Sequence, residues 1–174
     1  MAEGEGATTV SGVRDGQDTP VELLQAKTAA DWLQARELVE EYADSLGLDL
    51  EFQNFAHELA HLASEYAPPT GAFLLARAQG VALGCAGLRH FAEGTGEIKR
   101  LYVIPAGRGR GLGALLARRI VEEARAAGYS RLLLDTLPGM RAAQSLYVSL
   151  GFRPTSAYRF NPIPGAAYFE LSLG

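Results

Sequence analysis

Arg108-Gly109-Arg110-Gly111-Leu112-Gly113 is the segment that says most about how this chain folds. It lies between a stretch typical of a strand and a stretch typical of a helix, with Pro105 at the exit from the strand. Glycine lets a backbone approach a ligand closely, and the first turn of a helix adds a partial positive charge. The two arginines add full charges. We therefore expect a site for a phosphate or pyrophosphate, in preference to a glycine-rich turn whose arginines lie in water.

Three types of phosphate-binding loop compete for this segment. The P-loop pattern is excluded because no Gly-Lys-Ser/Thr follows. The fingerprint of dinucleotide-binding folds is met in part, and Asp135 ends the next strand about where a ribose-binding acid belongs. However, the chain after Gly113 is too short for a full doubly wound nicotinamide fold. The preceding strand also carries charged residues such as Glu97, whereas the first strand of such folds is apolar.

Strand and helix patterns flank the loop on both sides. Before it, residues 72–78, 81–91 and 97–104 predict three strands, joined by short turns that contain glycine. After it, a helix with an apolar face ends at Gly128, since glycine suits a helix C-terminus. The further elements that we expect are a buried strand at 131–136, a helix at 140–150, and strands near 156–160 and 166–171.

The first part of the chain predicts a strand and two helices. Thr28-Ala-Ala-Asp31 has the form of a capping box, and the apolar residues after it keep helical spacing up to Gly47. A second helix carries an apolar stripe from Phe52 to Leu62 and stops before two consecutive prolines. Residues 21–26 fit a short strand. Residues 1–20 contain few side chains that can pack, and we expect a flexible tail there.

These patterns predict a single domain over residues 21–174. The expected fold class is α/β: a twisted mixed sheet flanked by helices, largely antiparallel, with one parallel βαβ crossover. With 174 residues, the chain is too short for two ordinary domains and long enough to bury a core without a disulfide or metal.

Composition excludes several classes of protein. Hydrophobic residues at 48% and charged residues at 21% rule out a wholly disordered, collagenous or membrane-embedded chain. A net charge of −4 argues against nucleic-acid binding, which usually needs a basic surplus. The single cysteine, Cys85, excludes an intramolecular disulfide, and residues 1–20 show no signal peptide. We therefore expect a cytoplasmic protein without membrane or nucleic-acid partners; a homodimer is compatible with the sequence.

At this point three separated motifs resemble one family. Arg108-x-x-Gly111-x-Gly113 resembles the Arg/Gln-x-x-Gly-x-Gly/Ala loop of the GNAT acyl-CoA N-acyltransferases. Residues 97–105 resemble the fourth strand of that family, and Leu146-Tyr147-x-x-x-Gly151-Phe152 resembles its last helix and the turn after it. The order of the expected elements agrees from about Val21 to Leu173. The runs at 134–138 and 161–165 resemble a bacterial subgroup of unknown substrate.

The resemblance implies an N-acetyltransferase that moves an acetyl group from acetyl-CoA to a primary amine by direct transfer in a ternary complex. It implies that backbone groups near Val103 bind the pantetheine arm and the thioester oxygen, and that the N–H groups of the glycine loop bind the pyrophosphate. No metal or redox cofactor is expected, and the acceptor amine is not identified. The implied cofactor-binding residues are Leu101, Tyr102, Val103, Arg108, Gly109, Arg110, Gly111, Leu112, Gly113 and Ala114.

Two residues are candidates for proton transfer. Glu97 stands where some members of the family carry a general base; the alternatives are a surface acid at a strand end and a proton relay through water. Tyr147 stands where the family often has a tyrosine that protonates the departing thiolate, and its alternative is a core aromatic. A neutral phenol suits this acid role at pH 7. Asp135 and Thr136 either orient water and substrate or cap a strand, and Cys85 is expected to be a packed core thiol.

One motif points to a different chemistry. His57-Glu58-Leu59-Ala60-His61 matches the H-E-x-x-H of zinc peptidases. On a helix, however, His57 and His61 point away from the apolar stripe and toward water, whereas a peptidase holds its zinc helix at the floor of a cleft. A zinc peptidase therefore stays an alternative to the acetyltransferase. A catalytically silent CoA-binding or interaction module is another, and the presence of Glu97 and Tyr147 argues against it.

Overall fold

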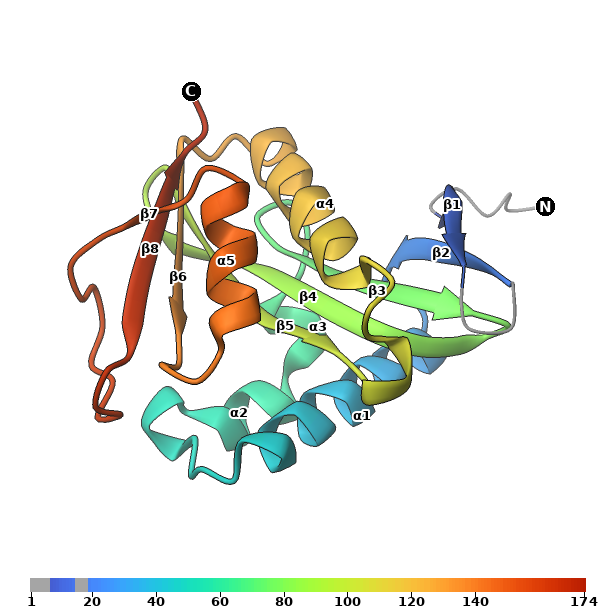
Figure 1. Ribbon diagram of the computed structural model, residues 1–174, viewed down its shortest axis with the longest axis horizontal. Helices are drawn as coiled ribbons and strands as arrows, with labels where there is room; N and C mark the ends of the chain where they lie inside the picture. Colours follow the sequence, from blue (N-terminus) through green and yellow to red (C-terminus); the bar gives the residue numbers. More distant parts are fainter. Residues whose placement is uncertain (1–6, 15–18) are drawn as a thin grey trace.

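The computed structural model describes residues 7–14 and 19–174, and its strands form one open sheet (Figure 1). The sheet has eight strands in the order β1-β2-β3-β4-β5-β6-β8-β7. The strands are β1 (Ala7–Arg14), β2 (Pro20–Gln25), β3 (Ala72–Ala78), β4 (Val81–Ala92), β5 (Thr95–Val103), β6 (Arg131–Thr136), β7 (Arg153–Pro154) and β8 (Ala167–Ser172). The helices are α1 (Ala29–Leu46), α2 (Phe55–Ala60), α3 (Leu62–Glu65), α4 (Leu112–Ala126) and α5 (Arg141–Ser149), with single 3-10 turns at Glu51–Gln53 and Pro105–Gly107.

Neighbouring strands of the sheet are antiparallel except for β5 and β6, which are parallel and are joined through α4. This arrangement confirms the predicted mixed α/β class with one parallel crossover. It also excludes the dinucleotide-binding alternative, because a doubly wound fold needs a mainly parallel sheet.

Two hydrophobic cores cover the two faces of the sheet. Successive side chains of a strand point to opposite faces. In β3, Leu74 packs in the core shared with α4 and α5, whereas Phe73 and Leu75 pack in the core shared with α1 and α3. Figure 1 shows α4 and α5 on one side of the sheet and α1 on the other. The central strands β3, β5 and β6 are therefore mostly buried between helices.

Several predicted boundaries are confirmed. Thr28 accepts a hydrogen bond from the Asp31 amide, and the Asp31 carboxylate accepts one from the Thr28 amide, which completes the capping box of α1. Gly47 ends α1 in the left-handed conformation with φ of 61°. Strands β3 and β4 and the hairpin between them lie where the strand patterns and the glycine turn predict them.

Two local expectations are wrong. The second helix is broken into a 3-10 turn, α2 and α3, because Asn54 (φ 57°) and His61 (φ −128°) leave helical geometry. No strand forms at residues 156–160, where the structure has a loop instead. The strand ends earlier, as the short β7, and the Tyr158 and Arg159 side chains of the loop bind Glu97 instead.

The flexible tail expected over residues 1–20 is also wrong for part of its length. Ala7–Arg14 form β1, which pairs antiparallel with β2, and Pro20 already belongs to β2. Backbone pairing along the edge of β2 needs no apolar side chain, and threonine and valine favour extended structure. The other residues of the expected tail, 1–6 and 15–18, lie outside the described residues.

Candidate active site

The site begins where the two parallel strands separate. Residues Thr95–Glu97 of β5 pair with Arg131–Leu133 of β6, and the pairing ends there. Beyond that point the two strands diverge, and α5 and the C-terminal half of α1 border the opening (Figure 1). Because the ladder stops, backbone groups at the end of β5 have no partner strand on this side. The opening therefore offers an unpaired strand edge to a ligand.

A β-bulge in β5 marks the separation. Lys99 pairs with Gly87 of β4, but Tyr102 pairs with Cys85, so β5 contains one residue more than β4 between these pairs. Arg100 has φ of 58°, in the left-handed region that a non-glycine residue rarely adopts. A bulge bends a strand and re-aims the residues after it. Leu101–Val103 therefore leave the direction of β6 and face the opening.

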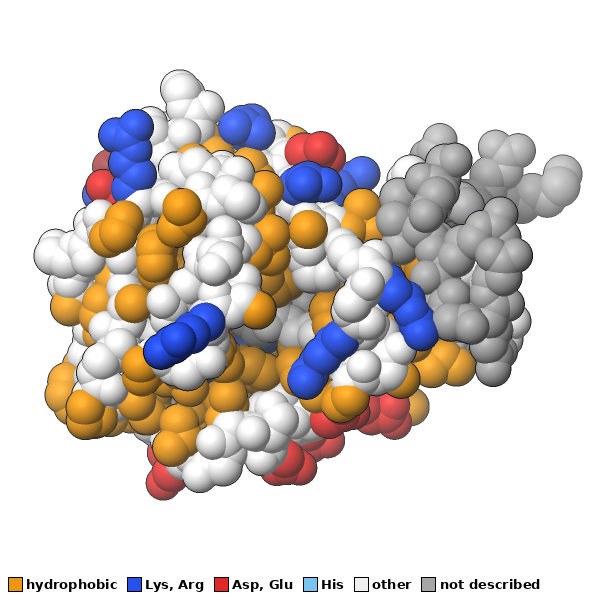
Figure 2. Space-filling view, viewed as in Figure 1, with side chains coloured by type: hydrophobic (Ala, Val, Ile, Leu, Met, Phe, Trp, Pro, Cys, Tyr) orange, Lys and Arg blue, Asp and Glu red, His pale blue; other side chains and the backbone are white. Residues whose placement is uncertain are grey.

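A groove of about 410 Å³ runs from the glycine loop to this opening. Leu101–Val103 form one wall, Arg108 and Gly113 stand at one end, and Met140 and Arg141 lie across from them. Figure 2 shows a hollow on this face with basic side chains on both sides of it. Two cationic side chains at a groove of this kind suit a phosphorylated ligand.

The glycine loop presents free amides beside the groove. Gly109 and Gly111 have φ of 77° and 75°, and an added Cβ at either would meet no atom within 4 Å. No side chain caps the N-terminus of α4. Among the described residues the amides of 109–114 have no backbone acceptor outside the helix, and the first turn of a helix supplies none. The loop can therefore donate several N–H groups to an anion.

The predicted cofactor-binding residues fall into two groups. Five of them line the groove: Leu101, Tyr102, Val103, Arg108 and Gly113. The others belong to the same turn without lining the groove: Gly109, Arg110, Gly111, Leu112 and Ala114. The side chain of Leu112 lies in the core, so that residue can offer a ligand only its amide.

A smaller cavity of about 60 Å³ continues from the groove into the opening between β5 and β6. The groove and the cavity share Tyr42, Leu101, Met140 and Ala143 in their walls, so the two are contiguous. The inner part of the cavity is polar, with the side chains of Gln53, Lys99, Asp135 and Asn161 around it.

Tyr147 from α5 lines this cavity. Its ring contacts Phe152 and Phe169 at centroid distances of 5.8 and 6.3 Å, as a core aromatic does. Its hydroxyl has no hydrogen-bond partner in the part of the chain that the structure describes. Burial raises the pKa of Tyr147 above its ordinary value, so the phenol stays protonated at neutral pH. A buried ring with a free hydroxyl at a cavity can both pack and donate a proton.

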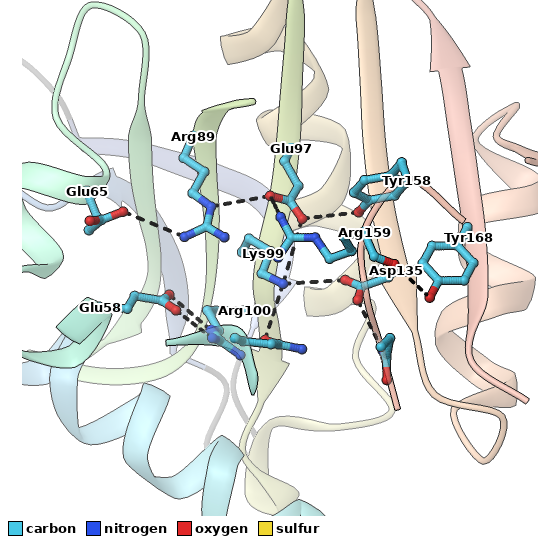
Figure 3. Close-up of polar contacts among 12 residues, drawn as sticks. Glu58, Glu65, Arg89, Glu97, Lys99, Arg100, Asp135, Tyr158, Arg159 and Tyr168 are labelled. Atoms are coloured by element: carbon cyan, nitrogen blue, oxygen red, sulfur yellow. Dashed lines mark hydrogen bonds and ion pairs between the residues drawn. The ribbon is translucent and has the colours of Figure 1, made fainter. Parts of the chain in front are cut away.

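Glu97 does not line the cavity. Its side chain is 1% exposed, and both carboxylate oxygens are engaged (Figure 3). Arg159 Nη2 lies 2.6 Å and Arg89 Nε 3.3 Å from one oxygen, while the hydroxyl of Tyr158 donates to the other at 3.1 Å. Lys99 Nζ lies 3.7 Å from that second oxygen. The predicted base therefore lies outside the cavity lining, where its carboxylate pairs with Arg89, Lys99 and Arg159.

Lys99 connects Glu97 to the cavity. Its ammonium lies 3.4 Å from a carboxylate oxygen of Asp135 and 3.3 Å from the side-chain oxygen of Gln53. Burial lowers the pKa of Lys99. Burial alone would raise the pKa of Asp135, but the charges of Lys99 and Arg159 and a hydrogen bond from Asn161 outweigh it, so this pKa is lowered. Asp135 is therefore an ionised carboxylate in the cavity wall.

The comparisons with known proteins decide the family. The acetyltransferase (GNAT) family model matches residues 30–152, which is more than half of the chain. The chain belongs to the acetyltransferase (GNAT) family. An uncharacterized N-acetyltransferase of Schizosaccharomyces pombe is 45% identical over 138 residues, which cover 78% of this chain and 85% of that protein.

Solved structures agree with the GNAT assignment. A Klebsiella pneumoniae protein assigned as an acyl-CoA N-acyltransferase superposes with a TM-score of 0.66 at 27% identity, covering 87% of this chain and 97% of that one. A Salmonella typhimurium protein solved with acetyl-CoA gives a TM-score of 0.64 at 22% identity, covering 88% and 94%. The protein is thus an acyl-CoA-dependent acetyltransferase of the GNAT family. No helix of the described residues has the length and apolar character that crossing a membrane requires.

The H-E-x-x-H sequence of this GNAT protein does not have the geometry of a zinc site. His57 and His61 are exposed, as predicted, and stack on each other at 4.2 Å. Glu58, which would activate water in a peptidase, is 2% exposed, and its carboxylate binds Arg100 and the hydroxyl of Tyr66. Among the described residues no group of three His, Cys, Asp or Glu side chains could hold a metal ion. The geometry therefore gives no support to a zinc peptidase.

Cys85 is buried, as predicted, and its thiol lies 3.2 Å from the carbonyl oxygen of Arg100. Burial raises the pKa of Cys85 to about 12, so it is not a nucleophile at neutral pH.

Sequence reasoning missed several residues of the site, and four of them show why. Arg141 could have been found, since it is a basic residue at the start of a helix that follows a strand. Tyr42 was hidden among the apolar residues that give α1 its spacing. Tyr158 and Arg159 carry no local signal, because only the tertiary path of the loop after β7 brings them to Glu97.

The ion pair of Glu58 predicts a pH dependence of stability. Burial alone would raise its pKa, but the hydrogen bonds and charge of Arg100 lower it from 4.5 to about 2. A lowered carboxylate pKa contributes stability above the unfolded pKa and loses it as the pH falls toward the folded value. From about pH 5 to about pH 3, this group should cost the wild type on the order of 2 kcal/mol of unfolding free energy. Urea unfolding at both pH values measures the difference.

Glu58→Gln should remove that part of the acid dependence. Glu40→Gln is the control, because Glu40 forms an exposed pair with Arg36 on α1 and should leave the dependence unchanged. An unchanged acid dependence in Glu58→Gln would contradict the assigned ion pair.

Proposed function

We propose that this GNAT protein transfers the acetyl group of acetyl-CoA directly to a primary amine while both are bound. The observation that carries the proposal is the continuity of the groove with the cavity. The groove begins at Arg108 and the free amides of the glycine loop, follows the edge of Leu101–Val103, and ends at the cavity that holds Tyr147. A phosphate site, a strand edge and a proton donor thus lie in the order that an acyl-CoA molecule needs.

In the proposed reaction the amine nitrogen attacks the carbonyl carbon of the thioester. An N–H near Val103 stabilises the negative charge that forms on the oxygen. The carbon–sulfur bond then breaks, and the Tyr147 hydroxyl gives its proton to the thiolate. The amine loses a proton to water in the cavity, and water restores the proton of Tyr147, so no net charge remains on the enzyme.

The geometry favours a changed role for Glu97. A base must reach the amine or a water beside it, whereas Glu97 lies outside the cavity wall and is bound by three cations. We propose that Glu97 holds Arg89, Lys99 and Arg159 in place. The ionised Asp135, which faces the cavity, is the carboxylate that orients the amine or its water. The cytoplasmic location and the homodimer stay predictions.

Ligand binding should raise the melting temperature. A ligand that binds only the folded state adds about 2.7 kcal/mol at a concentration of 100 Kd, or roughly 5–10 °C for a chain of this size. We expect this shift in thermal denaturation with acetyl-CoA and none with NADH or NADP. A shift with a dinucleotide and none with acetyl-CoA would overturn the proposal.

Two glycine variants locate the binding site. Gly111 and Gly80 both have positive φ, 75° and 78°, with open space around them, so an alanine at either costs about 1 kcal/mol of backbone strain. Gly80 lies in the β3–β4 hairpin, away from the groove. Gly111→Ala should weaken the acetyl-CoA shift, and Gly80→Ala should not.

A further inference from the structure

Glu58 is a buried charged group for which the proposed reaction has no use. It lines neither the groove nor the cavity, and its exposed fraction is 2%. One carboxylate oxygen accepts a hydrogen bond from Nε of Arg100 at 3.0 Å, and the other accepts one from Nη2 at 2.5 Å. The ion pair is therefore bidentate, which fixes its geometry. The Phe55 ring lies 5.2 Å from the guanidinium carbon. α2 therefore holds the Arg100 side chain in one orientation.

Arg100 is the residue with left-handed backbone in the bulge of β5. A non-glycine residue keeps such a conformation only where its surroundings over-determine it. The Cys85 thiol contacts its carbonyl oxygen, and Glu58 binds the far end of its side chain. The residues re-aimed by this bulge are Leu101–Val103, the wall of the groove.

A chain of contacts on the α1 side of the sheet supports the bulge. The Tyr66 hydroxyl donates to Glu58 at 2.5 Å, and the Tyr66 ring packs so closely on Gly87 that a Cβ there would lie 2.5 Å from a ring carbon. Gly87 is the pairing partner of Lys99, the residue before the bulge. The connection therefore runs from β4 through Tyr66 and Glu58 to Arg100, and it ties the bulge to the neighbouring strand.

We propose that Glu58 is a positioning residue: through Arg100 it holds the bulge of β5 and, with it, the strand edge at Leu101–Val103 on which acyl-CoA binds. The ligand's identity rests on the proposed function. The H-E-x-x-H sequence thus serves the acetyltransferase through its glutamate, from the side of the sheet opposite α4. The expected consequence is a change in the groove without any contact between Glu58 and the ligand.

The decisive variant is the double substitution Glu58→Gln with Arg100→Met. It removes both charges together, so no buried charge is left without a partner, and we expect the fold to be retained. In this variant, however, the bulge of β5 no longer has the Glu58–Arg100 ion pair that holds it. We expect its acetyl-CoA Kd, measured by calorimetry, to rise about ten- to a hundredfold, since a displaced strand edge loses hydrogen bonds to the ligand. Its melting temperature should stay near that of the wild type.

Three single variants separate positioning from simple stability. Glu58→Gln should lower both the melting temperature and the acetyl-CoA affinity. Asp31→Asn is the matched control: Asp31 is buried and pairs with Arg77 at 3.1 Å, outside the groove and the cavity. Asp31→Asn should lower the melting temperature. Its acetyl-CoA affinity, measured well below that melting temperature, should equal that of the wild type. Glu58→Asp, which keeps the charge, should recover part of the affinity lost in Glu58→Gln.

The outcomes distinguish this proposal from the function on which it rests. If the wild type binds acetyl-CoA and the double variant binds it equally well, the positioning role is wrong and the function stands. If the wild type itself does not bind acetyl-CoA, both are wrong. If the double variant does not fold, Glu58→Gln provides the test. An acetyl-CoA affinity equal to that of the wild type, measured below the melting temperature of Glu58→Gln, would also overturn the positioning role of Glu58.

Discussion

Tyr147→Phe should lower kcat by roughly ten- to a thousandfold, within or near the range that a positioned general acid contributes. The substitution removes one oxygen and keeps the ring on Phe152 and Phe169. The hydroxyl has no partner within the described chain, so neither the melting temperature nor the acetyl-CoA affinity should change much. Steady-state kinetics with a competent amine, together with thermal denaturation, checks all three expectations.

The pH profile adds a second readout for the same residue. Because burial raises the pKa of Tyr147, ionisation of this phenol should not limit turnover of the wild type below about pH 10. Raising the pH should not restore Tyr147→Phe, since deprotonating the amine does not replace the proton that the thiolate needs.

Tyr129→Phe is the control for Tyr147→Phe. The Tyr129 hydroxyl donates to the carbonyl oxygen of Thr70 at 2.6 Å and lies outside the groove and the cavity. Its loss should cost about 1 kcal/mol of stability and leave kcat unchanged. A Tyr147→Phe enzyme that melts several degrees lower yet turns over normally would show that Tyr147 is only a core aromatic.

Glu97→Gln should lower the unfolding free energy by about 3–5 kcal/mol, as expected when one partner of a buried ion pair is removed. The amide would leave Arg89, Lys99 and Arg159 close together without the carboxylate that they share. Glu170→Gln is the control, since Glu170 pairs with Arg131 at 3.7 Å on the surface and should cost at most about 1 kcal/mol. Urea unfolding at neutral pH measures both variants.

The activity of Glu97→Gln separates the two roles considered for this residue. If Glu97 only holds the cations, the folded variant loses activity to a similar extent at every pH. If Glu97 is the general base, the variant recovers as the pH rises, because solvent then deprotonates the amine. We expect the first result. A variant as stable as the wild type whose activity returns at high pH would restore the base role.

Local sequence patterns predicted the parts of the fold that local physics determines. The capping box at Thr28, the strands β3 and β4, and the glycine loop before α4 depend on spacing and backbone preference alone. The break of the second helix at Asn54 and the loop in place of a strand at 156–160 depend on tertiary packing.

In the site, too, some features follow from local sequence and others depend on tertiary packing. The groove wall at Leu101–Val103 and the position of Tyr147 followed from the motifs and the order of elements. The surroundings of Glu97 did not, because Arg159 reaches it across 62 positions of the chain. A carboxylate near a strand end looks alike in sequence whether it faces an open cavity or three cations.

The central claim is direct acetyl transfer from acetyl-CoA to an amine, and the most direct test is an assay of CoA release with mass spectrometry of the products. The panel of acceptors should hold amino acids, other small amines, peptide N-termini and lysine-containing peptides. We predict that at least one amine accelerates CoA release and gains an acetyl group on nitrogen, and that no acetyl group accumulates on the protein. Acetyl-CoA binding without transfer to any of these amines, or acetylation of the enzyme as an intermediate, would contradict the account.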